Sequence, residues 1–376
     1  MKEKRVLLMY ITEFSGHYHA AHAIENALKL KDHKVETLNI NAFHYTSPIT
    51  EKIVHKIYMG VIKRTPRIWE YLYDNPNFIN GTSSIKKFIN KFNSPKLKRL
   101  FDRFKPRAIV CSQAFPCGMT AAFKKAYNID VPLIGVLTDH APHSYWLYDN
   151  VDYYVVPSQD AKEVFVKKGV APERIKVLGI PIDPKFARPK NKERTARRLK
   201  LDLHTPIVLL MGGGQGIGPI NKIIKYLDKA RANFQIAVIT GTNKKLIKKL
   251  KDSRNKFNKK ITVFGYVHNV DELMEVSKLL ITKAGGITTT EALAKGLPMI
   301  IIKPIPGQED SNCEFLLRHK AAIKIRKAKE VTSCVERLIN AEGRLHQMGL
   351  NARKISKPQA ALDIAELILR SSSYAE

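Results

Sequence analysis

Cysteine is scarce in this chain of 376 residues, which contains four. Cys111, Cys117, Cys313 and Cys334 form neither a CxxC pair nor a grouping with the spacing of a zinc site. The pattern excludes a disulfide framework and is typical of proteins kept in a reducing compartment. We therefore expect the cysteines to be small core or surface residues, and the protein to be cytoplasmic.

Long hydrophobic runs are also absent. No segment approaches the roughly 20 apolar residues that a membrane-spanning helix needs. The apolar run of residues 6–10 is too short for the hydrophobic region of a signal peptide, and it is better interpreted as a first buried strand. Any contact with a membrane is therefore expected to be peripheral.

Acidic residues are few relative to basic ones, 34 against 64, which gives a formal net charge of +30. This excess predicts a polyanionic partner, and nucleic acid, an anionic membrane surface and phosphorylated ligands all remain open. A hydrophobic share of 44% indicates a fully globular protein. The length favours two domains of ordinary size.

Short apolar runs alternate with helical patterns along the chain, which predicts parallel sheets with crossover helices. The pattern occurs twice, and the proline-bearing basic segment of residues 182–201 lies between the halves, so we place a linker near residues 184–192. We expect an α/β protein with domains at 1–185 and 200–355, and an amphipathic helix at 358–371 that lies against either. The predicted strands are residues 6–11, 108–111, 133–137, 153–156, 207–211, 235–240, 279–282 and 299–302.

The stretch from Thr282 to Asn312 combines a glycine turn, a helix that begins at Thr288, and a rigid polar loop after an apolar strand. Gly285 and Gly286 permit a tight turn, and the amides and positive dipole end of the helix would face an anion. Polar side chains follow on the helix and on the loop: Thr288, Thr289, Thr290, Glu291, Gln308, Glu309 and Asn312. The stretch predicts a phosphate pocket with sugar-reading groups beside it.

A second glycine turn follows the strand 207–211 and would let a phosphate or a substrate approach the backbone closely. It consists of Gly212, Gly213, Gly214, Gln215 and Gly216. The turn is not a GxGxxG fingerprint with an acidic residue at the spacing of dinucleotide sites, and it lacks the GK[ST] ending of a P-loop. These absences disfavour a hydride-transfer enzyme and an ATPase.

The first half carries its own glycine turn, in which His17 follows Gly16 and a helix begins near Tyr18. A histidine there is placed to act as a general base near neutral pH, although a surface histidine that caps the helix fits equally well. The loop after the strand 133–137 contains Asp139, His140 and His143. Because active groups of open parallel sheets lie at the carboxyl ends of strands, we expect this loop to converge on His17.

A metal site formed by these histidines is an alternative, with His17, His19, His22, Asp139, His140 and His143 as its ligands. The first three do not have the HExxH spacing that places two ligands on one helix face. We therefore favour an aspartate-assisted histidine and expect no metal.

Five segments together resemble the monogalactosyldiacylglycerol synthase and processive diacylglycerol glucosyltransferase family, a part of glycosyltransferase family 28. They are SGHYHAAHAIENAL, TDHAPHSYW, VPSQDAKEVFVKKGVAPERIKVLGIPID, GGGQG and TKAGGITTTEALAKGLPMIIIKPIPGQEDSN. The resemblance covers both halves and implies a GT-B fold, in which two Rossmann-like domains face a central cleft. It also implies an inverting enzyme that binds a UDP-sugar in its C-terminal domain and a lipid in its N-terminal domain, without a metal. The chain contains no DxD triplet, in agreement with this.

The resemblance assigns roles to individual residues. His17 would be the base that deprotonates the acceptor, with Asp139 assisting it, and Glu291 would bind ribose. Gly265, Tyr266 and Val267 would read the uracil edge. The glycines at 212–216, Gly285, Gly286, Thr288 and Thr289 would bind the phosphates, with Lys283 as a nearby cation. Gln308, Glu309 and Asn312 would contact the sugar. Glu13 and Phe14 depart from the small residues expected there, which leaves the shape of the acceptor pocket open.

Residues 45–78 mix basic and aromatic side chains, including Lys63, Arg64, Arg67, Trp69 and Tyr71. Such a mixture suits an anionic bilayer interface, whereas aromatic stripes at helical spacing are more often core. The family resemblance favours the membrane, with Gly16, His143 and Trp146 also on the acceptor side. The basic run 244–260 is interpreted as a solvated helix face.

The sequence thus predicts a peripheral enzyme on the cytoplasmic face of the cell membrane that transfers glucose or galactose from a UDP-sugar to diacylglycerol. The alternatives are an N-acetylglucosaminyltransferase acting on a polyprenyl-linked acceptor, a nucleic-acid-binding protein suggested by the charge, and a UDP-sugar epimerase that uses no lipid. No recognised nucleic-acid motif supports the second of these, so we expect no nucleic-acid partner.

Overall fold

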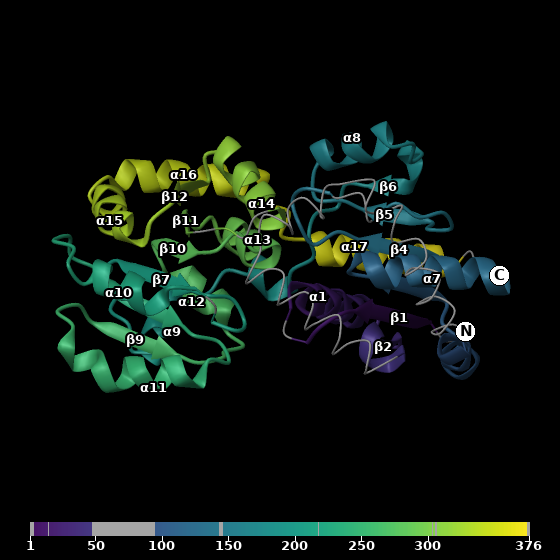
Figure 1. Ribbon diagram of the computed structural model, residues 1–376, viewed down its shortest axis with the longest axis horizontal. Helices are drawn as coiled ribbons and strands as arrows, with labels where there is room; N and C mark the ends of the chain where they lie inside the picture. The colour runs from purple at the N-terminus through teal and green to yellow at the C-terminus, as the bar shows by residue number, and fades with distance from the viewer. Residues whose placement is uncertain are drawn as a thin grey trace. The chain divides into compact units, whose positions relative to one another are not determined.

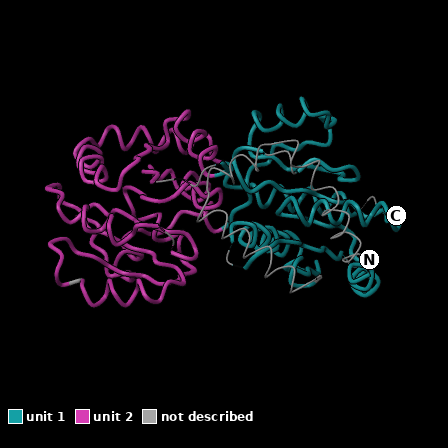
Figure 2. The backbone as a smooth tube through the Cα atoms, in the orientation of Figure 1, with its two compact units in different colours: residues 1–184, 306–308, 357–376 teal, residues 185–305, 309–356 magenta. Residues whose placement is uncertain are grey.

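The computed structural model describes residues 4–13, 15–46, 95–142, 146–216, 218–302, 304 and 307–373. The chain forms two compact units (Figure 2). The first contains residues 1–184, 306–308 and 357–376, and the second contains residues 185–305 and 309–356. The boundary at Pro184 lies at the start of the segment in which the sequence predicts a linker.

The first unit is built on a parallel sheet of six strands in the order β2-β1-β3-β4-β5-β6 (Figure 1). The strands are β1 Arg5–Tyr10, β2 Glu36–Asn41, β3 Ala108–Cys111, β4 Leu133–Val136, β5 Tyr153–Val155 and β6 Ile175–Lys176. The helices include α1 Gly16–Lys31, α2 Ala42–Thr46, α7 Ala114–Tyr127, α8 Gln159–Lys167, the short η2 Pro172–Arg174 and α17 Ala360–Ser373.

Helices cover both faces of this sheet, which explains why its inner strands are apolar throughout. Side chains alternate along β1, so Val6 and Leu8 pack on the face covered by α1 and α17. Leu7 and Met9 pack on the opposite face with side chains of α7 and α8. The C-terminal helix α17 therefore belongs to the first unit and lies beside α1 (Figure 1).

The second unit is a parallel sheet of six strands in the order β12-β11-β10-β7-β8-β9. Its strands are β7 Ile207–Met211, β8 Gln235–Ile239, β9 Ile261–Phe264, β10 Leu279–Thr282, β11 Met299–Ile302 and β12 Ala322–Ile325. Its helices include α9 Lys192–Leu199, α10 Ile220–Leu227, α11 Lys244–Ser253, α12 Val270–Val276, α13 Gly286–Lys295, α14 Gln308–Arg318, α15 Val331–Ile339 and α16 Glu342–Ile355, with η3 Pro184–Ala187, η4 Arg254–Lys256 and η5 Ala328–Glu330 as short turns.

The helices of the second unit show the amphipathic spacing that the crossover pattern requires. In α10, Ile220, Ile223, Ile224 and Leu227 are buried against the sheet. In α11, Leu250 is buried, while the lysines at 244, 245, 248 and 249 are exposed. The lysines of α11 therefore form a solvated helix face, as predicted for this part of the basic run.

All eight predicted strands are present, with bounds that differ by at most one residue. Two helices begin earlier than predicted: α1 at Gly16 rather than near Tyr18, and α13 at Gly286 rather than at Thr288. The four cysteines are buried and free of disulfides. Among the described residues, no helix is long and apolar enough to cross a membrane.

Candidate functional site

The strand order of the second unit reverses between β7 and β10, which pair directly. An open parallel sheet binds its ligands at such a switch point, outside the carboxyl ends of the strands. Two loops leave the sheet there: the glycine turn of residues 212–216 after β7 and residues 283–285 after β10. A Cβ atom on Gly213 would lie 3.4 Å from Cε of Lys283, so the two loops are in contact. The fold brings together the two motifs that the sequence separates by about seventy residues.

The glycine turn also packs tightly against the end of β8. Gly216 has a φ of +59°, and a Cβ atom there would lie 2.0 Å from the carbonyl oxygen of Thr240. Gly241 has a φ of +57°, and its Cβ would lie 2.1 Å from the carbonyl oxygen of Gly214. Backbone thus meets backbone on both sides, and the Thr242 amide donates to the Gly214 carbonyl at 2.9 Å. The turn is fixed before any ligand arrives.

We expect Gly216→Ala to destabilise the protein by about 1–3 kcal/mol more than Gly213→Ala, the cost typical of overpacking. Both glycines have positive φ, but at Gly213 a Cβ would meet only the flexible Lys283 side chain. Urea unfolding followed by circular dichroism gives the two free energies. Equal values for the two variants would contradict the packing described.

The N-terminus of α13 faces the same switch point without a side-chain cap. Its N-cap residue is Gly285, where a Cβ atom would meet no atom within 4 Å. The helical bond from the Thr289 amide to the Gly285 carbonyl leaves the preceding amides of Gly286, Ile287 and Thr288 outside the helical ladder. Amides outside the helical ladder and the positive end of the helix dipole suit an anion, and Lys283 precedes the N-cap residue by two positions.

The threonines of α13 divide between two roles. Thr289 is fully buried, and its hydroxyl donates to the carbonyls of Gly285 and Gly286 at 3.0 and 3.1 Å. Thr290 is buried as well and donates to Gly286. The hydroxyl and the amide of Thr289 are both used inside the helix, and its contact with phosphate stays a prediction. Thr288 is half-buried and remains a candidate.

Two residues of α14 hold the turn after β10. Glu309 is 8% exposed and forms an ion pair with Lys283. Asn312 is fully buried, and its amide donates to the Ala284 carbonyl at 3.0 Å. The Asn312 side chain thus holds the backbone of the turn, and its contact with the sugar stays a prediction.

The other predicted donor-binding residues lie at the same carboxyl edge of this sheet. Gly265, Tyr266 and Val267 follow β9, and all three are half-buried. Glu291 is half-buried on the second turn of α13, and Gln308 is the first residue of α14. These residues lie on the connection between β9 and α12, on α13 and at the start of α14, and their individual roles stay predictions.

In the first unit the strand order reverses between β1 and β3, and His17 lies at that switch point. Ser15 caps α1 by accepting a hydrogen bond from the Tyr18 amide, which places His17 in the first turn. Its Nδ1 lies 2.9 Å from the Ser112 carbonyl oxygen, after β3, and 2.9 Å from Oγ1 of Thr138, after β4. Three strand ends therefore converge on one imidazole.

These contacts define the tautomer of His17. A carbonyl oxygen only accepts, so Nδ1 must carry the hydrogen that it donates to Ser112, and Nε2 keeps its lone pair. Desolvation lowers the pKa of His17 from 6.5 to about 4, and the hydrogen bond to Ser112 opposes this only in part. His17 is therefore neutral at physiological pH, with a lone pair on Nε2, and its role as a base stays a prediction.

The loop after β4 does converge on His17, as predicted, but it does so through Thr138. The sequence interpretation chose Asp139 for this role and did not single out Ser112 or Thr138. An alternation of strands and loops indicates which loops meet, and it does not indicate which side chain of a loop points inward. Assistance by Asp139 stays a prediction.

Trp146 was predicted on the acceptor or membrane side and is instead a core residue. Its side chain is 3% exposed and packs in the cluster that contains Leu133 and Tyr154. Gly16 is exposed at the start of α1. The remaining predicted acceptor or membrane residues lie outside the described part of the chain: His143, Lys63, Arg64, Arg67, Trp69 and Tyr71.

Two of the histidines considered for a metal site, His17 and His22, contact different groups. His22 contacts Glu25 at 3.1 Å and packs on the Tyr18 ring, while His17 contacts Ser112 and Thr138. Among the residues that the structure describes, no group of three or more histidine, cysteine or acidic side chains is placed to hold a metal ion.

Two doubly wound units, each with candidate groups at its switch point, define a GT-B architecture. MurG from Acinetobacter baumannii has the same fold, with a TM-score of 0.65 and 15% identity over 98% of this chain and 99% of that one. HepE from Anabaena in complex with UDP-glucose matches with a TM-score of 0.57 and 12% identity, over 98% of this chain and 99% of that one. At these identities the comparison establishes the fold.

Sequence comparison establishes the family. Residues 17–182 match the monogalactosyldiacylglycerol (MGDG) synthase family, and residues 207–368 match the glycosyltransferase family 28 C-terminal domain. A processive diacylglycerol beta-glucosyltransferase from Bacillus cereus strain AH187 is 30% identical over 370 residues, which are 98% of this chain and 94% of that protein. The chain belongs to the monogalactosyldiacylglycerol synthase and processive diacylglycerol glucosyltransferase family, which confirms the resemblance inferred from its motifs.

Proposed function

We propose that this protein is an inverting glycosyltransferase that moves glucose or galactose from a UDP-sugar to 1,2-diacylglycerol. The observation that carries the proposal is the 30% identity to a diacylglycerol beta-glucosyltransferase over 98% of the chain. The product is a monoglycosyl diacylglycerol, and a second transfer to that product would give the diglycosyl lipid.

The second unit supports the donor half of the reaction. The free amides at the start of α13, the Thr288 hydroxyl and Lys283 suit a diphosphate, whose negative charge increases as the sugar leaves. We assign Glu291 to the ribose hydroxyls, the backbone of residues 265–267 to the uracil edge, and Gln308 and Glu309 to the sugar. Because these groups can stabilise the departing UDP by themselves, we expect transfer to proceed without a metal ion.

The first unit supports the acceptor half. Nε2 of His17 accepts the proton of the free hydroxyl of diacylglycerol while the hydroxyl oxygen forms a bond to C1 of the sugar. The bond between C1 and the diphosphate breaks in the same step, and UDP carries away the electron pair. One displacement converts the α linkage of a UDP-hexose into a β linkage, in agreement with the beta product named for the relative.

We further propose that the enzyme works at an anionic membrane surface, on its cytoplasmic face, as a peripheral protein without a nucleic-acid partner. A formal net charge of +30 supports this, because each basic residue near an anionic surface contributes about 1 kcal/mol of attraction. Two measurements distinguish an anionic membrane from nucleic acid as the partner. One is sedimentation of the protein with liposomes of increasing anionic-lipid content, and the other is its retention by DNA at physiological salt.

The experiment that tests the function is transfer from radiolabelled UDP-glucose and UDP-galactose, separately, to diacylglycerol in liposomes that contain EDTA. A labelled lipid establishes the acceptor, the donor and metal independence together. Saturable UDP binding without a lipid product would reject diacylglycerol and direct the search to polyprenyl-linked sugars. A product that ignores added lipid would instead favour an epimerase.

We expect the acid limb of the pH profile to lie near pH 4. The lowered pKa keeps His17 neutral down to about pH 4, so transfer is lost only as the pH falls through that value. The measurement is kcat/KM in detergent micelles from pH 3.5 to 8, with circular dichroism to verify folding at each point. A limb near pH 6.5 would contradict the environment described for His17.

A further inference from the structure

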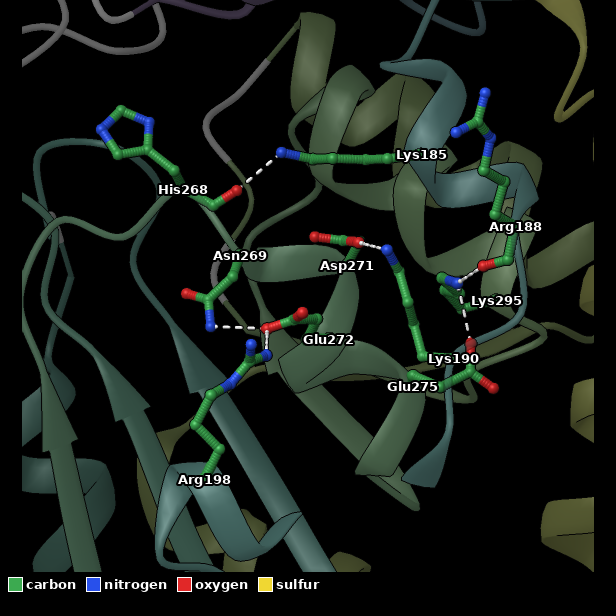
Figure 3. A network of polar contacts seen from close by, with 10 residues as sticks. All are labelled: Lys185, Arg188, Lys190, Arg198, His268, Asn269, Asp271, Glu272, Glu275 and Lys295. Atoms are coloured by element: carbon green, nitrogen blue, oxygen red, sulfur yellow. Dashed lines mark hydrogen bonds and ion pairs between the residues drawn. The ribbon is translucent and has the colours of Figure 1, made fainter. Parts of the chain in front are cut away.

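The residues that follow the boundary at Pro184 hold the loop between β9 and α12. We call residues 185–198 the linker segment and residues 265–269 the β9–α12 loop. Nζ of Lys185, the first residue of the second unit, donates to the carbonyl oxygen of His268 at 2.6 Å (Figure 3). The carbonyl belongs to the residue directly after the three proposed to read the uracil edge.

A second contact holds the other end of this loop. The side chain of Asn269 donates to Glu272 at 2.9 Å, and Arg198 of α9 forms an ion pair with the same carboxylate (Figure 3). Burial raises the pKa of Glu272, but the hydrogen bonds from Arg198 and Asn269 together with the charges of Arg198 and Lys190 leave it below its usual value. The carboxylate thus stays ionised between its two donors.

The linker segment is itself anchored to the second unit between these contacts. Lys190 forms an ion pair at 2.9 Å with Asp271, which is 2% exposed. The Arg188 carbonyl accepts from Nζ of Lys295, which also pairs with Glu275 (Figure 3). Lys185 therefore extends from an anchored backbone, and its hydrogen bond to His268 connects the β9–α12 loop to a fixed support.

We propose that Lys185 is a positioning residue for nucleobase recognition, holding the β9–α12 loop in the geometry that binds the uracil of the donor. The proposal rests on the function proposed above. Recognition of a base edge by backbone groups needs the loop held to about half an ångström. A loop without this support must be ordered at the moment of binding, which weakens affinity for any ligand that carries the base.

The test compares a ligand that has the base with one that lacks it. Lys185→Met keeps the aliphatic stem and removes the donor, whereas Lys185→Arg keeps a donor. Calorimetry with UDP and with inorganic pyrophosphate gives the dissociation constants. For Lys185→Met we expect UDP to bind roughly three- to tenfold more weakly, within the range of mutations that act through such networks, with pyrophosphate unchanged. KM for the UDP-sugar should rise by the same factor at constant kcat, and Lys185→Arg should restore both values.

Lys190→Met is the matched control. It leaves the nearly buried Asp271 without its cation and should lower the free energy of unfolding, but Lys190 contacts no residue of the β9–α12 loop in the hydrogen bonds and ion pairs of Figure 3. The ratio of UDP to pyrophosphate affinity should therefore stay at the parent value.

Three results would overturn the inference: unchanged UDP affinity in Lys185→Met, an equal loss of pyrophosphate affinity, or failure of Lys185→Arg to restore binding. Equal loss for both ligands would mean that Lys185 acts on the phosphates. Absence of saturable UDP binding in the parent enzyme would overturn the proposed function and this inference with it.

Discussion

Replacing His17 by alanine should lower kcat for transfer by about 10²- to 10⁴-fold, the contribution typical of a positioned general base. The acceptor hydroxyl would then lose its proton to water, because Nε2 is the basic atom that Ser112 and Thr138 orient. UDP affinity should be unchanged, since the groups assigned to the UDP part of the donor belong to the second unit. Initial rates with labelled UDP-sugar, beside calorimetry with UDP, measure both quantities.

His33→Ala is the control for this variant, because His33 is exposed just beyond the C-terminal end of α1. It should transfer sugar at the parent rate. Thr138→Val removes one of the two contacts to Nδ1 and retains the hydrogen bond to Ser112, so its loss should be smaller than that of His17→Ala. If His17→Ala keeps most of the parent activity, His17 is not the base.

The strands that were predicted from the sequence and those that were not differ in how fully the sheet buries them. The eight predicted strands all lie inside the two sheets, where helices cover both faces and apolar side chains are required along the whole strand. The four that were not predicted are β2, β6, β9 and β12, the edge strands of the two sheets. β2 reads ETLNIN and is only partly buried, so it lacks the continuous apolar run by which the others were found.

The candidate site was predictable at the level of loops and less so at the level of side chains. Glycine turns and strand ends can be read from composition, and the fold places them at the two switch points. The direction of a side chain is set by the helix that carries it: consecutive residues differ by about 100° around an α-helix. Thr288 and Thr289 therefore point in different directions, and the structure buries Thr289. Trp146 was misplaced for another reason, since an aromatic residue near a site serves the core equally well.

Replacing Lys283 by methionine should lower kcat by about 10²- to 10³-fold, the loss typical of one group that stabilises developing charge, and should also weaken UDP binding. Cε of Lys283 lies against Gly213, and Lys283 precedes the N-cap residue of α13 by two positions, near the place where the diphosphate is proposed to bind. Lys278→Met is the matched control. Lys278 precedes β10 as Lys283 follows it, and its side chain is 61% exposed at the opposite end of the strand. Activity of that variant should equal that of the parent.

The ion pair with Glu309 gives Lys283 a second role, which a double variant separates from the first. Lys283→Met leaves the largely buried Glu309 carboxylate without its cation, and this alone destabilises the fold. Adding Glu309→Gln removes the unpaired charge, so the double variant should recover free energy of unfolding toward the parent value while transfer and UDP affinity stay low. Recovery of activity together with stability would mean that Lys283 serves the packing of α14, and that the anion is held by the helix amides without it.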